Sequence, residues 1–259
     1  LTELTLPSSV TNIGVDAFSS NGLEKITVES GNSRYDSRGN CNSIIDTETN
    51  TLIAGCKNSV IPNSVRSIGD SAFEGCSGLT ELTLPNSVTS IGYAVFKGCS
   101  GLTKLTLPNR VTSIADDAFH GCSGLIKLTL PSSVTSIGNS AFYGCSGLTE
   151  LTLPSSVTSI RDGAFKGCSG LTELTLPNSV TSIGDGAFHG CSGLTELILP
   201  NSVTSIGDGA FHGCSGLEKI AVESGNSCYD SRDNCNSIID TETNTLIAGC
   251  KNSVIPNSV

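Results

Sequence analysis

The amino-acid sequence predicts a β-rich α/β repeat solenoid, in which short coils of the chain stack into a right-handed superhelix. Two observations carry this prediction. A leucine that opens a near copy of one segment recurs every 23 residues, at Leu79, Leu102, Leu125, Leu148, Leu171, Leu194 and Leu217. The composition is also repetitive, with 29 Gly, no Trp and no Met among 259 residues. Self-similarity of this kind is typical of stacked repeats, whereas a globular core has no fixed period.

Each repeat begins with the pattern of a short β-strand. In residues 171–193 the inward positions one, four and six hold leucine, namely Leu171, Leu174 and Leu176. Glu173 and Thr175 alternate with them and point outward, and Pro177 ends the strand. A second apolar pair and a glycine-containing turn follow. We expect residues 187–191 to close the coil as a short helical or 3₁₀ segment.

Equivalent side chains are expected to form ladders, because one coil cannot bury its own apolar edge. Identical positions then stack on the next coil at the spacing of parallel strands, about 4.8 Å. All eight phenylalanines occupy one repeat position, and we expect a single buried ladder of Phe18, Phe73, Phe96, Phe119, Phe142, Phe165, Phe188 and Phe211. The aromatic rings therefore belong to the core and not to a base-stacking surface.

Two units break the period. The distance from Glu29 to Pro62, and again from Glu223 to Pro256, is 33 residues, so longer coils are expected at about 29–61 and 223–255. In each of them two apolar runs flank a polar turn, which predicts a β-hairpin. Residues 217–259 match residues 23–65 at all but three positions.

These repeats predict one leucine-rich-repeat solenoid over residues 1–259. We expect the chain to be part of a longer repeat array, because the second copy of the long unit is complete only to the equivalent of Val65. Apolar coil faces and unpaired strand edges at the ends of such a stack favour end-to-end self-association.

The segment 61–80 reads Ile-Pro-Asn-Ser-Val-Arg-Ser-Ile-Gly-Asp-Ser-Ala-Phe-Glu-Gly-Cys-Ser-Gly-Leu-Thr. It closely resembles the BspA-like (Treponema pallidum-type) leucine-rich repeats of bacterial surface proteins, which also occur in some protist parasites. The long unit, with residues 35–38 and 51–58, is similar to one in such proteins of gut and oral bacteria, and the resemblance covers essentially the whole chain. Two departures predict local distortion: residues 19–22 are one residue short and lack the cysteine, and Arg161 replaces the usual glycine.

The resemblance implies a secreted or surface-anchored adhesin, located at the cell surface or outside the cell. Some members of the family bind host matrix proteins such as fibronectin and fibrinogen, or mediate coaggregation between cells. The expected partner is therefore a protein, either of the host matrix or of another cell surface. A structural stalk that spaces another domain from the cell and has no ligand of its own is the alternative.

The charge and the missing motifs exclude several other function classes. A formal net charge of −10 and a pI near 4.6 leave no basic surface for nucleic acid or anionic lipid. No apolar stretch reaches the length of about 18 to 20 residues that a membrane span needs. The sequence contains no Gly-x-Ser-x-Gly, His-Glu-x-x-His, phosphate-loop or EF-hand pattern. We expect neither catalysis nor a cofactor.

The chain has 12 cysteines, seven of which take one repeat position: Cys76, Cys99, Cys122, Cys145, Cys168, Cys191 and Cys214. We interpret these seven as buried, reduced thiols that act as small apolar side chains. Parallel Cβ vectors disfavour disulfides within the ladder, and no ladder cysteine has another close enough in sequence for a zinc motif. A cross-strand disulfide between Cys41 and Cys56, and between Cys235 and Cys250, stays open.

The three histidines each follow a ladder phenylalanine. His120, His189 and His212 share this position with serine, glutamate, lysine and tyrosine in other coils, which is typical of a solvated face. His189 and His212 are one coil apart, but two ligands without a neighbouring column of carboxylates make a poor metal site. We expect no metal centre.

The outward strand positions are the candidate binding surface. Position three carries charge throughout, and position five is mostly threonine. A solvated sheet face would explain this pattern, but solenoids commonly bind partners on such faces, and mixed charge beside threonine suits a polar protein partner. The predicted partner-binding residues are Glu81, Lys104, Lys127, Glu150, Glu173, Glu196, Lys219, Thr129, Thr152 and Thr175.

Overall fold

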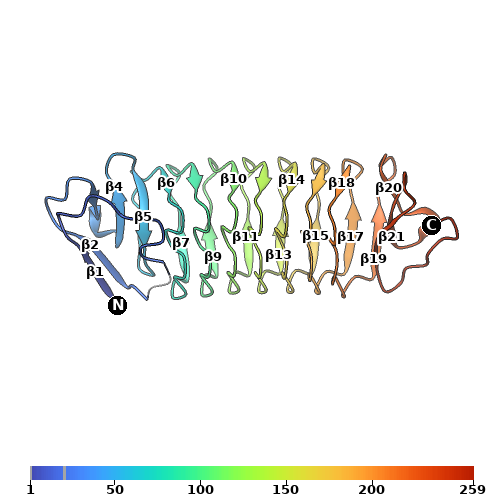
Figure 1. The fold of residues 1–259 in the computed structure, drawn as a ribbon, viewed down its shortest axis with the longest axis horizontal. Helices are drawn as coiled ribbons and strands as arrows, with labels where there is room; N and C mark the ends of the chain where they lie inside the picture. Colours follow the sequence, from blue (N-terminus) through green and yellow to red (C-terminus); the bar gives the residue numbers. More distant parts are fainter. Residues whose placement is uncertain (1, 20–21) are drawn as a thin grey trace.

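The computed structural model describes residues 2–19 and 22–259, which form a stack of β-coils along one axis (Figure 1). One side of the stack, called the strand face below, carries the first strand of each coil. Among the described residues these strands are β1 (Glu3–Leu6), β2 (Lys25–Val28), β7 (Glu81–Thr83), β9 (Lys104–Thr106), β11 (Lys127–Thr129), β13 (Glu150–Thr152), β15 (Glu173–Thr175), β17 (Glu196–Leu199) and β19 (Lys219–Val222). Where they pair they are parallel and in register, as in Glu150 opposite Glu173, so the 23-residue spacing is confirmed.

A second set of short strands covers another side of each coil. These are β6 (Ser67–Ile68), β8 (Ser90–Ile91), β10 (Ser113–Ile114), β12 (Ser136–Ile137), β14 (Ser159–Ile160), β16 (Ser182–Ile183) and β18 (Ser205–Ile206). Their isoleucines point into the coil, and where the strands pair they are parallel and in register, as Ile160 is with Ile183. β8 and β10 are not paired, so this second ladder has two parts, β6–β8 and β10 to β18.

The third side of the coil consists of turns, and the predicted helical closure is wrong. In the described part of the chain the helices are two short 3₁₀ turns, η1 (Arg38–Asn40) and η2 (Arg232–Asn234), both in the long units. Left-handed residues explain the difference: Gly186 and Gly190 have φ angles of 57° and 75° on either side of Ala187 and Phe188. A positive φ cannot continue a right-handed helix. The fold is thus a β-solenoid, and the α/β assignment overstated its helix content.

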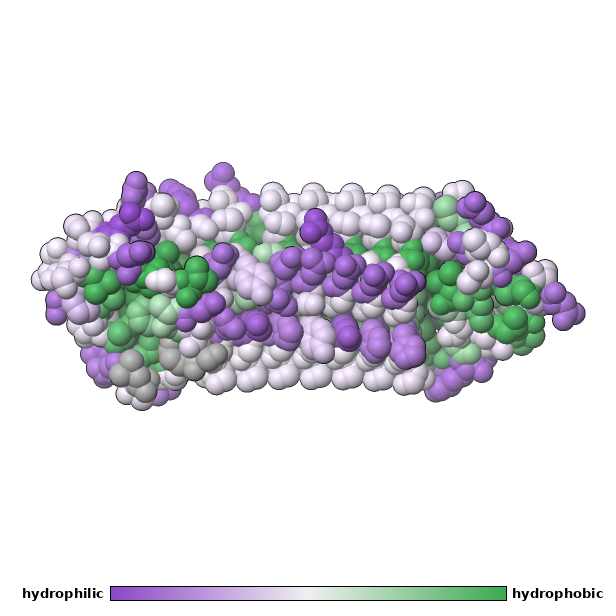
Figure 2. Space-filling view, in the orientation of Figure 1, coloured by the Kyte–Doolittle hydropathy of each residue, from purple (hydrophilic) through white to green (hydrophobic). Residues whose placement is uncertain are grey.

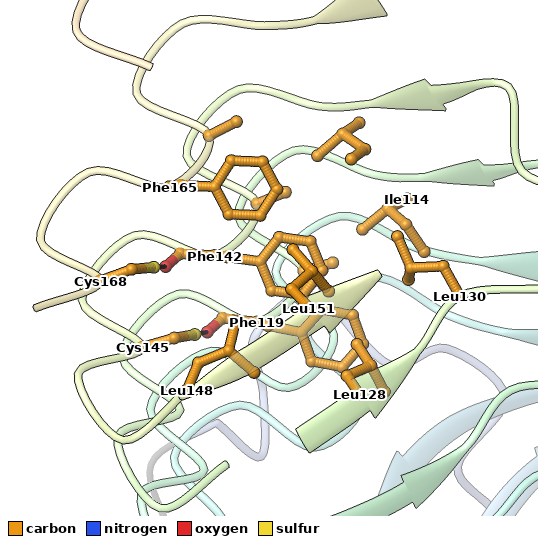
Figure 3. Packing of buried hydrophobic residues seen from close by; sticks show 14 of the residues in the cluster. Ile114, Phe119, Leu128, Leu130, Phe142, Cys145, Leu148, Leu151, Phe165 and Cys168 are labelled. Atoms are coloured by element: carbon orange, nitrogen blue, oxygen red, sulfur yellow. Dashed lines mark hydrogen bonds between the residues drawn. The ribbon is translucent and has the colours of Figure 1, made fainter. Parts of the chain in front are cut away.

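Phenylalanine rings fill the centre of the coils. Seven of them stack from Phe73 to Phe211, with neighbouring ring centroids 5.1 to 5.6 Å apart. Figure 3 shows the rings of Phe119, Phe142 and Phe165 one above another, beside leucines of the strand face. The predicted ladder is confirmed for these seven, but Phe18 packs in a separate, smaller core cluster.

The predicted hairpins are present in both long units. In the first, β3 (Tyr35–Asp36), β4 (Ser43–Asp46) and β5 (Thr51–Gly55) are antiparallel; in the second, β20 (Tyr229–Asp230), β21 (Ser237–Asp240) and β22 (Leu246–Gly249) repeat the arrangement. The first hairpin is buried on both faces. Ile45 and Leu52 belong to the main core, whereas Ile44 and Ala54 belong to the cluster of Phe18, so the hairpin divides the core in two.

The hairpin register also decides the question of cross-strand disulfides. The turn is centred on Glu48 and Thr49, which would place Cys41 opposite Cys56, but a bulge at the Ile44/Ile45 step shifts the register by one residue. The same shift occurs in the second hairpin. All twelve cysteines are free, and the thiol of Cys56 donates instead to the carbonyl oxygen of Asn42 at 3.4 Å.

The turn before each phenylalanine shows a dependence between neighbouring coils. The carboxylate of Asp116 accepts a hydrogen bond from the backbone of Asn139 at 2.7 Å, and a Cβ on Gly138 would lie 2.4 Å from the same carboxylate oxygen. The position of Gly138 therefore requires glycine when the preceding coil places an aspartate beneath it. Arg161 lies above Asn139 and not above an aspartate, and its N–H donates to Ile137 at 3.1 Å, as glycines do at this position.

The coil of Arg161 is accordingly regular, and the predicted distortion there is wrong. Ser20 and Asn21, part of the other predicted irregularity, lie outside the described residues. The right-handed winding, the 33-residue length of the long coils and the single solenoid over residues 1–259 remain predictions.

Candidate interaction surface

The strand face brings together all ten residues predicted to bind a partner. Each of them is exposed, while the leucines between them are buried, as the alternation of a half-buried strand requires. Position three of successive coils forms a column of charged side chains parallel to the axis of the stack. Glu150 and Glu173 are in-register neighbours in this column, as are Lys127 and Glu150.

Ion pairs along the column are unevenly distributed. Lys127 lies 2.6 Å from Glu150, Lys219 2.5 Å from Glu196, and Lys104 4.0 Å from Glu81. All these side chains are about half exposed or more, so each pair is worth about 0 to 1 kcal/mol. In the described part of the chain, Glu173 has no cationic partner within ion-pair distance. It lies between Glu150 and Glu196, and like charges in register destabilise a sheet by a few tenths of a kcal/mol.

Between β7 and β19 the strand face is interrupted at two places. Its strands there form the sheets β7–β9, β11–β13–β15 and β17–β19, with no pairing between β9 and β11 or between β15 and β17, while β1 and β2 form a separate sheet. Each interruption coincides with an isoleucine in a column that otherwise holds mostly threonine. Ile126 is at position two near the first, and Ile198 at position five near the second; they are 55% and 44% exposed.

Each interruption is hollowed into a groove, and the two grooves have opposite charge. The first, called the basic groove, has a volume of about 480 Å³ and is lined by Lys104, Lys127 and Ile126, among others. The second, called the acidic groove, has a volume of about 590 Å³ and is lined by a different set that includes Glu173, Glu196, Glu223 and Ile198. The charged walls face solvent and the floors are the buried leucines of the strands.

The basic groove also contains an unpaired backbone carbonyl. In other coils the carbonyl oxygen at position two accepts hydrogen bonds from the next coil; Thr80, for example, accepts from the N–H and the hydroxyl of Thr103. Thr103 itself has no such donor among the described residues, because isoleucine at 126 has no hydroxyl group and the strands are not paired there. Its carbonyl oxygen is available to a ligand.

The histidines and cysteines form no site of their own. His189 and His212 have ring centroids 4.9 Å apart, and His120 stacks on Tyr143 at 4.6 Å. Within residues 2–19 and 22–259, no group of three or more His, Cys, Asp or Glu side chains is arranged to hold a metal ion. The ladder thiols are buried, and burial raises their pKa, to about 12 for Cys76 and about 11 for Cys214.

Sequence reasoning located the face but missed the two grooves. The available signal was the replacement of threonine by isoleucine at 126 and at 198, which the repeat pattern displays. Nothing in one sequence indicates that the strands separate at these points, because separation depends on the stacking of several coils.

No described helix has the length and apolar character needed to cross a membrane.

Comparison with known proteins agrees with this geometry. The model of the BspA-type leucine-rich repeat region matches in six copies, over residues 1–55, 43–172 and 158–248. No curated protein matches the chain. Among solved structures, the leucine-rich repeat protein of T. pallidum is 33% identical, with a TM-score of 0.59, over 67% of this chain and 86% of that one.

A leucine-rich repeat protein from Eubacterium ventriosum is 25% identical, with a TM-score of 0.56, over 82% of this chain. The match spans 58% of that protein. The pneumococcal vaccine antigen PcpA shares the fold at 22% identity, with a TM-score of 0.53, over 86% of this chain and 56% of that one. The repeat pattern, the β-coils and the family model agree, and the chain belongs to the BspA-type leucine-rich repeat family.

Proposed function

We propose that this protein is a cell-surface or secreted protein-binding module, an adhesin that contacts host matrix proteins or other cells through its strand face. The observation that carries the proposal is the column of exposed, in-register charges at position three, interrupted by two grooves. Family membership supports the surface location and the protein partner.

The strand face suits recognition of a polar protein. Its side chains extend from paired, in-register strands within each sheet, so little backbone entropy is lost when a partner binds. Charged groups alternate with threonine, and two isoleucines supply exposed apolar contact area. Mixed charge of this kind contributes mainly to specificity and to the rate of association. The residues that we propose to contact the partner are the ten named above.

Surface-plasmon binding to immobilised fibronectin, fibrinogen and collagen, with an unrelated protein as reference, tests the proposal. The wild-type chain should bind at least one of them saturably. A variant with Glu150→Lys, Glu173→Lys and Glu196→Lys should lose most of this binding, because the reversed column repels the groups that it attracted. Higher salt should weaken wild-type binding in parallel.

A charge-matched control separates the strand face from net charge. The variant with Glu48→Lys, Asp208→Lys and Glu242→Lys makes the same change in net charge at exposed positions outside the strand face. It should bind like the wild type. Equal loss in both variants would contradict the assignment of the strand face, and saturable binding to none of the proteins would favour a stalk.

We also propose that the ends of the solenoid can associate. Hydrophobic surface gathers near both ends in the view of Figure 2. Val254 is 73% exposed and Ile255 is 49% exposed. Sedimentation velocity should show mass that rises with concentration and a weaker rise for Val254→Glu with Ile255→Glu; a constant monomer mass would contradict this.

A further inference from the structure

The two grooves lie on one face, carry opposite charge and are separated by a fixed number of coils. From this arrangement we infer that the strand face is a bipolar docking site for an extended peptide segment of the partner, with a carboxylate side chain in the basic groove and a cationic side chain four residues away in the acidic groove. The inference rests on the proposed function, since it specifies the chemistry that the strand face recognises.

The basic groove provides partners for a carboxylate and for a peptide N–H. Lys104 and Lys127 are neighbours across the unpaired β9/β11 boundary, and their side chains are 72% and 65% exposed. Among the described residues each forms an ion pair with a single exposed glutamate, so its ammonium group can be shared with a ligand at little cost. The unpaired carbonyl oxygen of Thr103 accepts a main-chain N–H, and Ile126 contacts an apolar side chain.

The acidic groove provides partners for a cation. Glu173 has no ion-pair partner within the described part of the chain, and it is flanked by two further carboxylates of the same column. A lysine or arginine of a ligand placed here relieves the repulsion within the column and gains a carboxylate partner that no described cationic side chain uses. Ile198, in the same groove, covers the aliphatic part of such a side chain.

The separation of the grooves fits an extended chain. The basic groove lies between β9 and β11 and the acidic groove between β15 and β17, which is three coil spacings, or about 14 Å at about 4.8 Å per coil. Four residues of an extended peptide span about 13 to 14 Å. Residues four apart also point to the same side of an extended chain, so both charged side chains reach the face together.

The opposite charges of the grooves favour a peptide over other polymers. An acidic glycan or a nucleic acid could pair with the lysines but would be repelled by the column of Glu150, Glu173 and Glu196. A purely basic peptide would fill the acidic groove and leave the basic groove empty. Only a peptide that carries a negative and a positive side chain at this spacing can form ion pairs in both grooves.

Two fluorescein-labelled peptides of identical composition test the inference by fluorescence polarisation. In the first, aspartate and lysine are four residues apart with leucine midway between them and threonine elsewhere; in the second, aspartate and lysine are adjacent. The first should bind the wild-type chain about tenfold more tightly than the second. Equal affinity of the two peptides, or no binding of either, would overturn the inference.

Charge reversal in the protein supplies the matched variants. Lys104→Glu with Lys127→Glu, and separately Glu173→Lys with Glu196→Lys, should each weaken binding of the first peptide about tenfold. The quadruple variant is bipolar again, with its poles exchanged, and should recover affinity to within about threefold because the peptide can bind in the opposite direction. Failure of this recovery, with circular dichroism unchanged, would overturn the inference.

The outcomes separate this inference from the proposed function. If the chain binds a matrix protein, and loses that binding when the position-three glutamates are reversed, but does not distinguish the peptides, the proposed function stands and the bipolar peptide site is wrong. A heparin fragment could instead bind more tightly than either peptide and lose this binding when Lys104 and Lys127 are reversed. That result would identify the ligand as an acidic glycan and overturn the inference of a peptide.

Discussion

The thiol of Cys145 donates a hydrogen bond to the carbonyl oxygen of Phe119 in the preceding coil, with the sulfur 3.1 Å from the oxygen (Figure 3). The same relationship recurs between Cys99 and Phe73, Cys122 and Phe96, Cys168 and Phe142, Cys191 and Phe165, and Cys214 and Phe188. The cysteine column is therefore a series of weak hydrogen bonds between coils as well as a column of apolar side chains.

We expect Cys145→Ala to lower the free energy of unfolding by about 1 to 2 kcal/mol, because it removes the thiol hydrogen bond to the buried Phe119 carbonyl and opens a small cavity. That carbonyl keeps its other donor, the backbone N–H of Cys122 at 3.0 Å. Cys228→Ala, at a half-buried position outside the ladder, should change it by less than about 0.5 kcal/mol. Urea denaturation followed by circular dichroism measures both. Equal effects of the two substitutions would show that the ladder hydrogen bond contributes nothing.

The buried thiols should make the fold sensitive to alkali. The pKa of an ordinary thiol is 9.0, and burial raises that of Cys76 to about 12 and that of Cys214 to about 11. The pKa of these thiols is higher in the folded than in the unfolded chain, so their protonated form favours the folded state. This contribution to the free energy of unfolding is fully present below about pH 9 and is lost as the pH rises through the folded pKa. Melting temperatures from about pH 8 to about pH 11 should fall steeply above about pH 9.

Alkylation gives an independent measure of thiol burial. Iodoacetamide added to the folded chain should modify Cys228 readily and spare Cys122, Cys145 and Cys168, and mass spectrometry of the digested chain identifies the products. In urea all twelve cysteines should react. Rapid modification of the ladder thiols in the folded chain would contradict their burial.

Gly55 and Gly78 differ in what a new methyl group would meet. A Cβ on Gly55 would lie 2.1 Å from the ring of Phe73, whereas at Gly78 the nearest atom is Cδ of the Lys57 side chain at 3.1 Å. We expect Gly55→Ala to cost about 1 to 3 kcal/mol, since the Phe73 ring must move, and Gly78→Ala less than about 0.5 kcal/mol because the Lys57 side chain can shift. Similar losses in urea denaturation would contradict this difference.

Arg34 and Cys228 are equivalent residues of the two long units, and their exchange should move the pKa of a neighbouring aspartate. Burial of Asp46 raises its pKa, but the N–H groups of Thr49 and Glu48 and the guanidinium group of Arg34 outweigh burial and lower it. A lowered folded pKa stabilises the fold above the ordinary value of 3.8, and this stabilisation is lost as the pH falls through the folded pKa.

We therefore expect Arg34→Cys to raise the pKa of Asp46, so that acid unfolding begins at higher pH. Cys228→Arg should lower the pKa of Asp240, which has no arginine partner among the described residues. Carboxyl ¹³C chemical shifts titrated from about pH 6 to about pH 2 measure both values. An unchanged Asp46 in the Arg34→Cys variant would show that the backbone N–H groups alone hold its pKa.

Alanine should be tolerated differently at Gly138, which lies above an aspartate of the preceding coil, and at Arg161, which does not. Gly138→Ala should cost about 2 kcal/mol, because the new Cβ meets both the carboxylate and the backbone of Asp116. Arg161→Ala, at the equivalent position above Asn139, should change stability by less than about 0.5 kcal/mol since a Cβ is already accommodated there. Equal tolerance in thermal unfolding would refute the steric explanation.

Much of the fold and the candidate face could be predicted from residue spacing. The alternation at Leu174, Thr175 and Leu176 gave the inward and outward sides of a strand, since side chains of a strand alternate in direction. The hairpin at residues 43–55 followed from two apolar runs around a polar turn. The predicted helix around Phe188 is wrong because Gly186, before the segment, and Gly190, within it, both adopt left-handed φ angles. Their positions in the sequence do not reveal this conformation.

The sequence by itself determined the stack of β-coils, the buried ladders and the charged strand face, because a fixed period places identical residues above one another whatever the details of the coil. The tertiary structure alone decided the register of the hairpin, the division of the core around Phe18 and the opening of the two grooves. Each of these depends on how closely neighbouring coils and strands approach one another, which the spacing of residues in one sequence does not express.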